Sequence, residues 1–286
     1  MTPTGTLYGR QVLVRLIPPD GDARELRGLR VAWTSKKTTS GTPSTCTIQV
    51  YNPSADSIAA MESAQSVIEL WAGYSGMDPN GHLDPTRLGT PQLIWRGNPV
   101  PFGVKSESRP PDRILTVEAS DGGALTSSGR VSISFTTQTT PAQILQEALR
   151  QTGVPTDAVS FPQTPVYPAG FRFSGRVVDL FSQLASTTGN QWYIRDGALV
   201  FAAGDMAAGS VVVIGSDTGM VGSPTPKSDG SVEVTILLNP AVRVGGLVQV
   251  QSLYVNGTYK VQTIEMEGDS GFADPYYMKL TAIKQG

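Results

Sequence analysis

Glu265 and Glu267 are the two side chains best placed by their spacing to do chemistry. They are two residues apart, so on a continuous strand both carboxylates would point to the same face. Glycoside hydrolases use two facing carboxylates to cleave a glycosidic bond. Pairs of this kind are also common on solvated strand faces, and we favour that interpretation.

The residue types that usually bind metals or act as bases are scarce. His82 is the only histidine, and it lies in a segment rich in Gly, Asn and Asp that is typical of a solvated loop. Cys46 is the only cysteine and lies in a run with the alternation of a strand. One histidine and one cysteine far apart in sequence make neither an ordinary zinc site nor a disulfide. We therefore expect no metal and no cofactor.

Residues 268–271 read Gly-Asp-Ser-Gly, which is superficially similar to the nucleophile segment of trypsin-like serine proteases. The similarity ends at the next position, where Phe272 replaces the glycine of that pattern, and the sequence around His82 does not match that family's histidine segment. A catalytic triad is defined by geometry rather than by short strings. We interpret 268–271 as a polar loop between strands, and we predict that the chain is not an enzyme.

The composition limits the possible partners. Only 16% of the 286 residues are charged, whereas a typical soluble domain has about 25%. A surface with few charges is often covered by another subunit. The net charge of −2 and the pI near 5.5 argue against a surface that grips nucleic acid phosphates. The N-terminus lacks the features of a signal peptide, and no run approaches the roughly 20 apolar residues of a membrane span, so we expect folding in a reducing cytosol without a membrane segment.

The rest of the chain is organised around residues 48–74, which read as a strand, a short helix and a second strand. Asn52 and Pro53 end the first strand, because proline has no amide hydrogen for the ladder. The helix is too short to be stable alone and must lie on the flanking sheet. The stretch contains no nucleophile, base or metal ligand, so we expect it to build a surface.

The patterns before and after this stretch predict further strands and two helices. Residues 77–91 are dense in Gly, Pro, Asn and Asp and predict a long exposed loop. Thr140, Pro141 and Gln143 predict a capped helix that Gly153 ends, and a second helix is expected between Ser174 and Gly189. Hairpin turns are expected at residues 196–197 and 256–257, and the other predicted strands lie at residues 10–17, 29–33, 92–97, 113–119, 232–238 and 276–283.

We predict a mainly β fold with an α/β insertion. The expected domains are a first β domain at residues 1–122, a small α/β domain with two helices and a hairpin at 123–205, and a second β domain at 206–286. No sequence repeat relates the two β domains. Subunit contacts are expected at apolar residues of strand-like runs that we take to be exposed, and the candidates are Ile68, Leu70, Trp71, Tyr74, Trp95, Leu238 and Tyr259.

The order of these segments resembles the gp27-like hub proteins of contractile phage tail baseplates. The similarity rests on residues 48–74 followed by 93–97, on 237–240 with 244–246, on 256–264 leading to 267–269, and on Thr140-Pro141 and residues 189–192 in the middle. The resemblance implies that both β domains are tube-like barrels. Three copies would then form a ring of six barrel units that joins a six-fold tail tube to a three-fold central spike.

The resemblance also implies partners. They are the tail tube protein, the baseplate wedge proteins, a tape measure protein in the central channel, and DNA that passes without specific binding. Only three residues follow Ile283, so we expect the spike to be a separate polypeptide. The protein would assemble in the host cytoplasm and reside in the virion. Two alternatives remain open: a distal tail protein or another tube adaptor, and a cell-wall carbohydrate-binding or degrading module.

Overall fold

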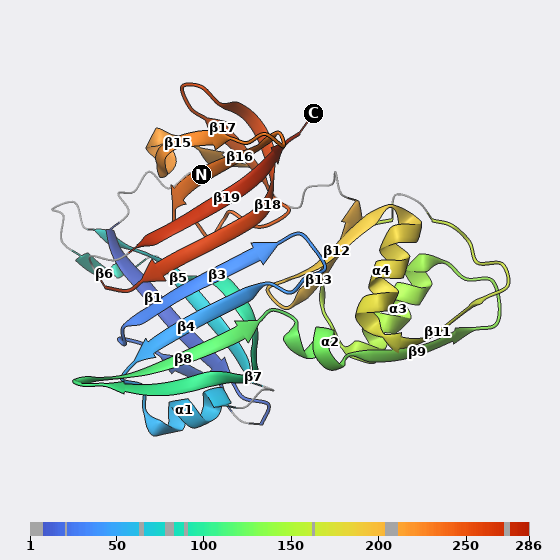
Figure 1. Cartoon of the computed structure of the whole chain (residues 1–286), viewed down its shortest axis with the longest axis horizontal. Coiled ribbons are helices and arrows are strands. Elements are labelled where there is room, and N and C mark those ends of the chain that lie inside the picture. Colours follow the sequence, from blue (N-terminus) through green and yellow to red (C-terminus); the bar gives the residue numbers. More distant parts are fainter. Residues whose placement is uncertain are drawn as a thin grey trace.

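The computed structural model describes residues 8–20, 22–62, 66–77, 83–88, 91–161, 164–203, 211–271 and 275–285. The fold is mainly β, as predicted, and the α/β part is inserted between two β regions (Figure 1). We call residues 8–120 the first region, 123–203 the middle region and 212–284 the last region. The predicted boundaries of three domains, at residues 122 and 205, stay a prediction.

The first region contributes eight strands and one helix. They are β1 (Tyr8–Ile17), β2 (Arg24–Leu26), β3 (Val31–Thr38), β4 (Thr45–Tyr51), α1 (Ala55–Glu62), β5 (Val67–Met77), β6 (Leu83–Leu88), β7 (Gln92–Arg109) and β8 (Asp112–Ser120). The strand, helix and strand predicted at residues 48–74 are confirmed as β4, α1 and β5. Asn52 ends β4 with a positive φ of 55°, which an asparagine tolerates better than most residues.

Strand β7 is much longer than the predicted 92–97 because it passes from one layer of the region to the other. Residues 92–97 pair with β5, and residues 98–109 pair with β8, with a register shift between Pro99 and Val104. Trp95 lies on this strand and is fully buried. Strands β1 and β5 consequently lie behind β3, β4 and β8 and cross them (Figure 1).

The last region contains six strands and a short 3-10 helix. They are β14 (Val212–Ile214), η1 (Ser216–Thr218), β15 (Met220–Pro226), β16 (Ser231–Leu237), β17 (Leu247–Gln251), β18 (Asn256–Asp269) and β19 (Tyr276–Lys284). Strand β18 joins this region to the first. Its residues 256–260 pair with β17, whereas residues 263–269 pair with β3, so one 14-stranded sheet runs through both β regions.

The middle region has its own hydrophobic core. Its elements are α2 (Gly123–Ser128), β9 (Arg130–Phe135), α3 (Pro141–Thr152), β10 (Thr156–Val159), β11 (Phe171–Arg176), α4 (Val177–Thr188), β12 (Asn190–Arg195) and β13 (Ala198–Ala203). The two longer helices lie side by side over a two-stranded and a three-stranded sheet (Figure 1). The predicted cap of α3 is confirmed, because Gln143 N donates to Thr140 Oγ1 and Thr140 N donates to Gln143 Oε1 at 2.9 Å.

The structure corrects two local predictions. Part of the predicted loop at 77–91 is strand β6, because residues 83–88 pair with the edge of β5, and this tertiary pairing overrides their low strand propensity. The hairpin between β17 and β18 turns at residues 252–255 and not at Asn256 and Gly257, which are the first residues of β18. The side chain of Asn256 instead bonds across the turn to the backbone of Ser252. His82 lies outside the described residues.

Candidate functional site

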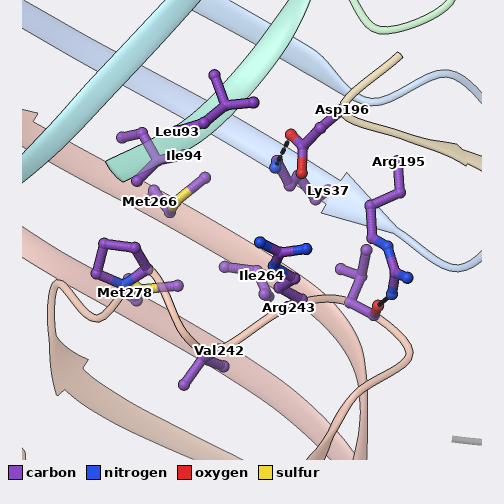
Figure 2. Close-up of a pocket in the computed structure, with 12 residues that line it drawn as sticks. Lys37, Leu93, Ile94, Arg195, Asp196, Val242, Arg243, Ile264, Met266 and Met278 are labelled. Carbon is purple, nitrogen blue, oxygen red and sulfur yellow. Dashed lines mark hydrogen bonds and ion pairs between the residues drawn. The ribbon is translucent and has the colours of Figure 1, made fainter. Parts of the chain in front are cut away.

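The three regions meet around a small cavity lined by residues of β3, β7, the β12–β13 turn, the 240–244 segment and β18 and β19. Its volume of about 20 Å³ leaves room for roughly one water molecule, so it is too small for a ligand. One wall is charged and the other contains Met266 and Met278 (Figure 2). We call this place the junction.

Lys37, Asp196 and Asp121 form the charged cluster of the junction. Lys37 Nζ contacts Asp196 Oδ1 (Figure 2). The Asp121 carboxylate accepts hydrogen bonds from the backbone N–H groups of Asp196 at 2.7 Å and Gly197 at 2.9 Å. These contacts tie β3, the start of the middle region and the β12–β13 turn into one unit.

The turn can present its backbone in this way because both of its central residues are left-handed. Asp196 has a φ of 53° and Gly197 a φ of 86°, which fits the Asp-Gly hairpin predicted from the sequence. Their two N–H groups therefore point together at the Asp121 carboxylate. A residue with a Cβ would be strained at position 197 and would also approach the Arg96 side chain at 3.3 Å.

Burial and the nearby negative charge of Asp196 raise the pKa of Asp121 to about 7, although Lys37 and the two backbone amides act in the opposite direction. The cluster contains two carboxylates and one ammonium group, so a neutral Asp121 balances its charges. Asp121 is fully buried and both of its oxygens accept hydrogen bonds. A substrate therefore cannot reach it, and we interpret it as a structural group rather than a general base.

Arg195 makes the second link of the junction. Its Nη1 donates to the carbonyl of Val244 at 2.8 Å (Figure 2). Its Nε donates to Asp157 Oδ2 at 2.7 Å. The guanidinium therefore connects two strands of the middle region with a segment of the last region. The approach is close, since a Cβ on Gly245 would lie 2.1 Å from Tyr193 Oη.

Cys46 and the pair of glutamates fit structural or solvated positions. Cys46 is buried, and burial raises the pKa of its thiol far above the ordinary value. Glu265 and Glu267 are both exposed on one face of β18, and Glu265 Oε1 accepts from Lys36 Nζ at 2.8 Å. This cross-strand pair is the solvated arrangement that we favoured from the sequence.

Residues 268–271 form the end of β18 and a structural corner. Asp269 pairs with Arg30 at 2.8 Å, and Ser270 Oγ accepts from Val31 N at 2.9 Å. Gly268 packs under Trp33, where a Cβ would lie 2.2 Å from the indole. Neither the serine nor the aspartate is arranged as part of a triad with a histidine among the described residues.

The structure corrects the premise that the seven candidate interface residues are exposed. Five of them are at most 7% exposed because they pack in the core of the subunit itself: Ile68, Leu70, Trp95, Leu238 and Tyr259. Trp71 and Tyr74 are half-buried, and their role in a subunit interface stays a prediction. Alternating apolar residues mark a buried face, but they do not reveal whether the same chain or another chain covers it.

Sequence reasoning missed the charged residues of the junction. One signal was available, because Val31, Trp33 and Ser35 alternate inward along β3 and Lys37 continues this series. A lysine at an inward position of a strand must find a buried partner. The partner itself comes from a region more than 150 residues away, and the sequence pattern does not specify it.

No helix is long and apolar enough to cross a membrane within the part of the chain that the structure describes. Among the same residues, no group of three or more His, Cys, Asp or Glu side chains is placed to hold a metal ion.

One family of known proteins matches most of the chain. Residues 14–282 match the family described as baseplate hub gp41. No curated protein sequence matches the chain.

Several solved structures share the fold at low sequence identity. The tail protein of Neisseria meningitidis MC58 aligns with a TM-score of 0.64 and 11% identity, over 98% of each chain. The 43 kDa tail protein of prophage MuSo2 from Shewanella oneidensis gives 0.57 and 11%, over 96% of this chain and 98% of that one. An E. coli type VI secretion component, described as similar to the T4 tail proteins gp27 and gp5, gives 0.61 and 14%, over 95% and 77%.

Proposed function

The chain belongs to the baseplate hub gp41 family, and from this premise we propose that it forms a trimeric ring between the tail tube and the central spike. The coarser role, a structural hub component of a phage tail, follows from the family and agrees with the shared fold of the tail proteins. The trimer, its channel and its partners are the proposed part.

The observation that carries the proposal is the continuous sheet through both β regions. Strand β18 pairs with β17 along one part and with β3 along the next, so the two β regions are held side by side in a fixed relation. Three copies of such a chain would present six β units to a six-fold tube while keeping three-fold symmetry toward a spike. The junction supports the same role, because the buried Lys37–Asp196 ion pair fixes the middle region against the first region, and the hydrogen bond from Arg195 to the Val244 carbonyl fixes it against the last region.

The partners follow from this position. We propose that the ring contacts the tail tube protein on one face and a separate spike protein on the other, with wedge proteins outside and the tape measure protein in the channel. The description of the E. coli neighbour as similar to gp27 and gp5 supports a spike partner. A net charge of −2 suits a channel through which DNA slides without binding, and assembly is proposed to occur in the host cytoplasm before incorporation into the virion.

The test is the subunit count, measured by native mass spectrometry and light scattering on the purified chain alone and mixed with its candidate spike protein. Three copies, alone or on a trimeric spike, are the expected result. Six copies would overturn the trimer and favour a distal tail protein or another tube adaptor. A chain that stays monomeric in the presence of the spike would overturn the hub position.

Measuring hydrolysis by the wild type and by one double variant distinguishes the hub from the alternative of a cell-wall carbohydrate module. We expect neither the wild type nor the double variant Glu265→Gln, Glu267→Gln to hydrolyse cell-wall material, because Glu265 is bound to Lys36 on a solvated face. Loss of a measurable hydrolysis in this double variant would support the enzyme instead.

A further inference from the structure

A groove of about 810 Å³ runs along the outer side of β1, and it is distinct from the junction. Its size lies within the range of roughly 300–1,000 Å³ typical of ligand sites. One wall is β1 at residues 10–13 together with Arg15, and the opposite wall is formed by residues 25–30 and 270–271. The groove therefore lies where the first region meets the end of β18.

The edge of β1 is open in this groove. On the side away from β5, the ladder to β2 covers only residues 14–16. No other described strand pairs with residues 10–13 on that side. An open edge presents backbone groups that an added strand can pair with.

The groove is positively charged although the chain has a net charge of −2. Four arginines and one glutamate line it: Arg10, Arg15, Arg27, Arg30 and Glu25. Arg30 is paired with Asp269, Arg27 with Glu25 at 2.9 Å, and Arg15 with Glu69 at 3.8 Å. Arg10 instead donates to the carbonyls of Asp269 and Gly271 and lies over the Tyr276 ring, and its charge helps to lower the pKa of the nearby Asp269 carboxyl.

The groove also has an apolar side. Trp71 lies opposite Leu13 in the β1–β5 ladder, and Leu29 and Pro91 complete this part of the lining. The Trp71 indole is fixed, since its Nε1 donates to Glu69 Oε2 at 3.1 Å. A fixed aromatic side chain in the lining of the groove offers an apolar surface to a side chain of an added strand.

We propose that this groove binds an extended acidic segment of a partner protein as an added strand along β1. The backbone of the segment pairs with residues 10–13, its carboxylates contact Arg10 and Arg27, and an apolar side chain packs on Trp71. This inference goes beyond the hub function and does not require a trimer. The open strand edge favours a peptide over nucleic acid. Phosphates could contact the arginines, but only a peptide backbone can also pair with the strand edge.

The probe is a fluorescent peptide of alternating Glu and Val residues, measured by fluorescence anisotropy with the full chain. We expect saturable binding that weakens with salt. Arg27→Glu is expected to weaken it at least about tenfold, and this side chain is exposed with only Glu25 as a partner, so the variant keeps the fold. Arg10→Glu is a second variant, and Arg172→Glu, an exposed position on β11, is the matched control.

A second peptide, with proline in place of every valine, tests the strand pairing. It keeps the charges but loses the N–H group of every second residue, which interrupts a strand ladder, so it is expected to bind at least about tenfold more weakly. Equal binding of both peptides would overturn strand addition. Three results would overturn the proposal that the partner is an acidic segment of a protein. They are no binding of the first peptide up to about 1 mM, an unchanged affinity of both groove variants, and tighter binding of single-stranded DNA. If the chain self-associates with rising concentration and Arg27→Glu abolishes this, the occupant of the groove would be a second copy of this chain instead of another protein.

Discussion

At the scale of residues, the junction shows how few charges hold the middle region in place. Lys37, Asp121 and Asp196 come from three separate segments, and each is buried or nearly so. Buried charges are retained only when partners satisfy them, and breaking one pair leaves the other charge uncompensated. The contacts of Lys37 and Asp121 with the β12–β13 turn therefore hold the middle region against β3.

The first prediction follows from the raised pKa of Asp121. Its folded value of about 7 exceeds the ordinary value near 3.9, so the protonated form stabilises the fold. This contribution is complete below the unfolded pKa and is lost as the pH rises toward 7. The free energy of unfolding should fall between pH 4 and 7, by at most about 1.4 kcal/mol per pH unit from this group, and then level off.

Urea unfolding at several pH values checks this prediction in the wild type and in Asp121→Asn. The variant removes the titrating group and one of two acceptors, so it should lose about 1–3 kcal/mol at pH 5 and show a flatter profile from pH 5 to 7. Asp179→Asn is the control, because this exposed carboxyl has a pKa held low by its hydrogen bonds with Arg176. A profile in Asp121→Asn as steep as in the wild type would contradict the assignment.

At the scale of elements, β18 carries the connection between the two β regions. It is 14 residues long and exchanges one partner strand for another along the same edge. The exchange needs close packing where β18 pairs with β3, and Gly268 provides it. Its position opposite Trp33 lets the indole lie directly over the backbone.

The second prediction concerns Gly268→Ala. A Cβ there would lie 2.2 Å from the Trp33 ring, so the ring or the strand must move, and we expect a loss of about 1–3 kcal/mol in the free energy of unfolding. Gly73→Ala on β5 is the matched control, since its Cβ would meet Pro91 at an ordinary 3.5 Å. Equal effects of both substitutions in thermal or urea unfolding would show that the Trp33 contact is not limiting.

The elements also show what the sequence could predict. The cap of α3 and the Asp-Gly turn of the β12–β13 hairpin depend on neighbouring residues, and both were predictable. Strand β6 depends on pairing with β5, and the turn at residues 252–255 depends on where β18 begins. Strand pairing decides these two features rather than local propensity, and the contact between Lys37 and Asp196 joins residues 159 positions apart, which the sequence pattern does not specify.

At the scale of the whole molecule, the surface combines few charges with large apolar side chains at projecting positions. Phe102 is 97% exposed, and Leu253 and Tyr254 at the β17–β18 turn are 83% and 84% exposed. Large apolar side chains exposed in this way are typical of contact sites for other subunits. They are a better basis for an interface than the buried residues expected from the sequence.

Phe102 carries the last prediction. It lies in the register shift of β7 with a φ of 61°, a conformation that disfavours a bulky residue, and Gly103 beside it leaves no room for a Cβ. The strand therefore holds an exposed aromatic side chain in a strained position, which is common where a residue serves binding.

Phe102→Asn separates binding from folding, because asparagine tolerates this φ and the side chain buries nothing in the free chain. We expect the free energy of unfolding to change by no more than about 0.5 kcal/mol, or to rise. Assembly into the proposed ring, or binding to the spike, should weaken by about 2 kcal/mol or more if Phe102 is an anchor of the contact. Native mass spectrometry measures assembly, titration calorimetry measures binding to the spike, and urea unfolding measures stability. Val166→Asn, at another exposed apolar position, is the control. Unchanged assembly in Phe102→Asn would place the contact elsewhere on the surface, whereas a large loss of stability would mean that the side chain serves the fold of the subunit.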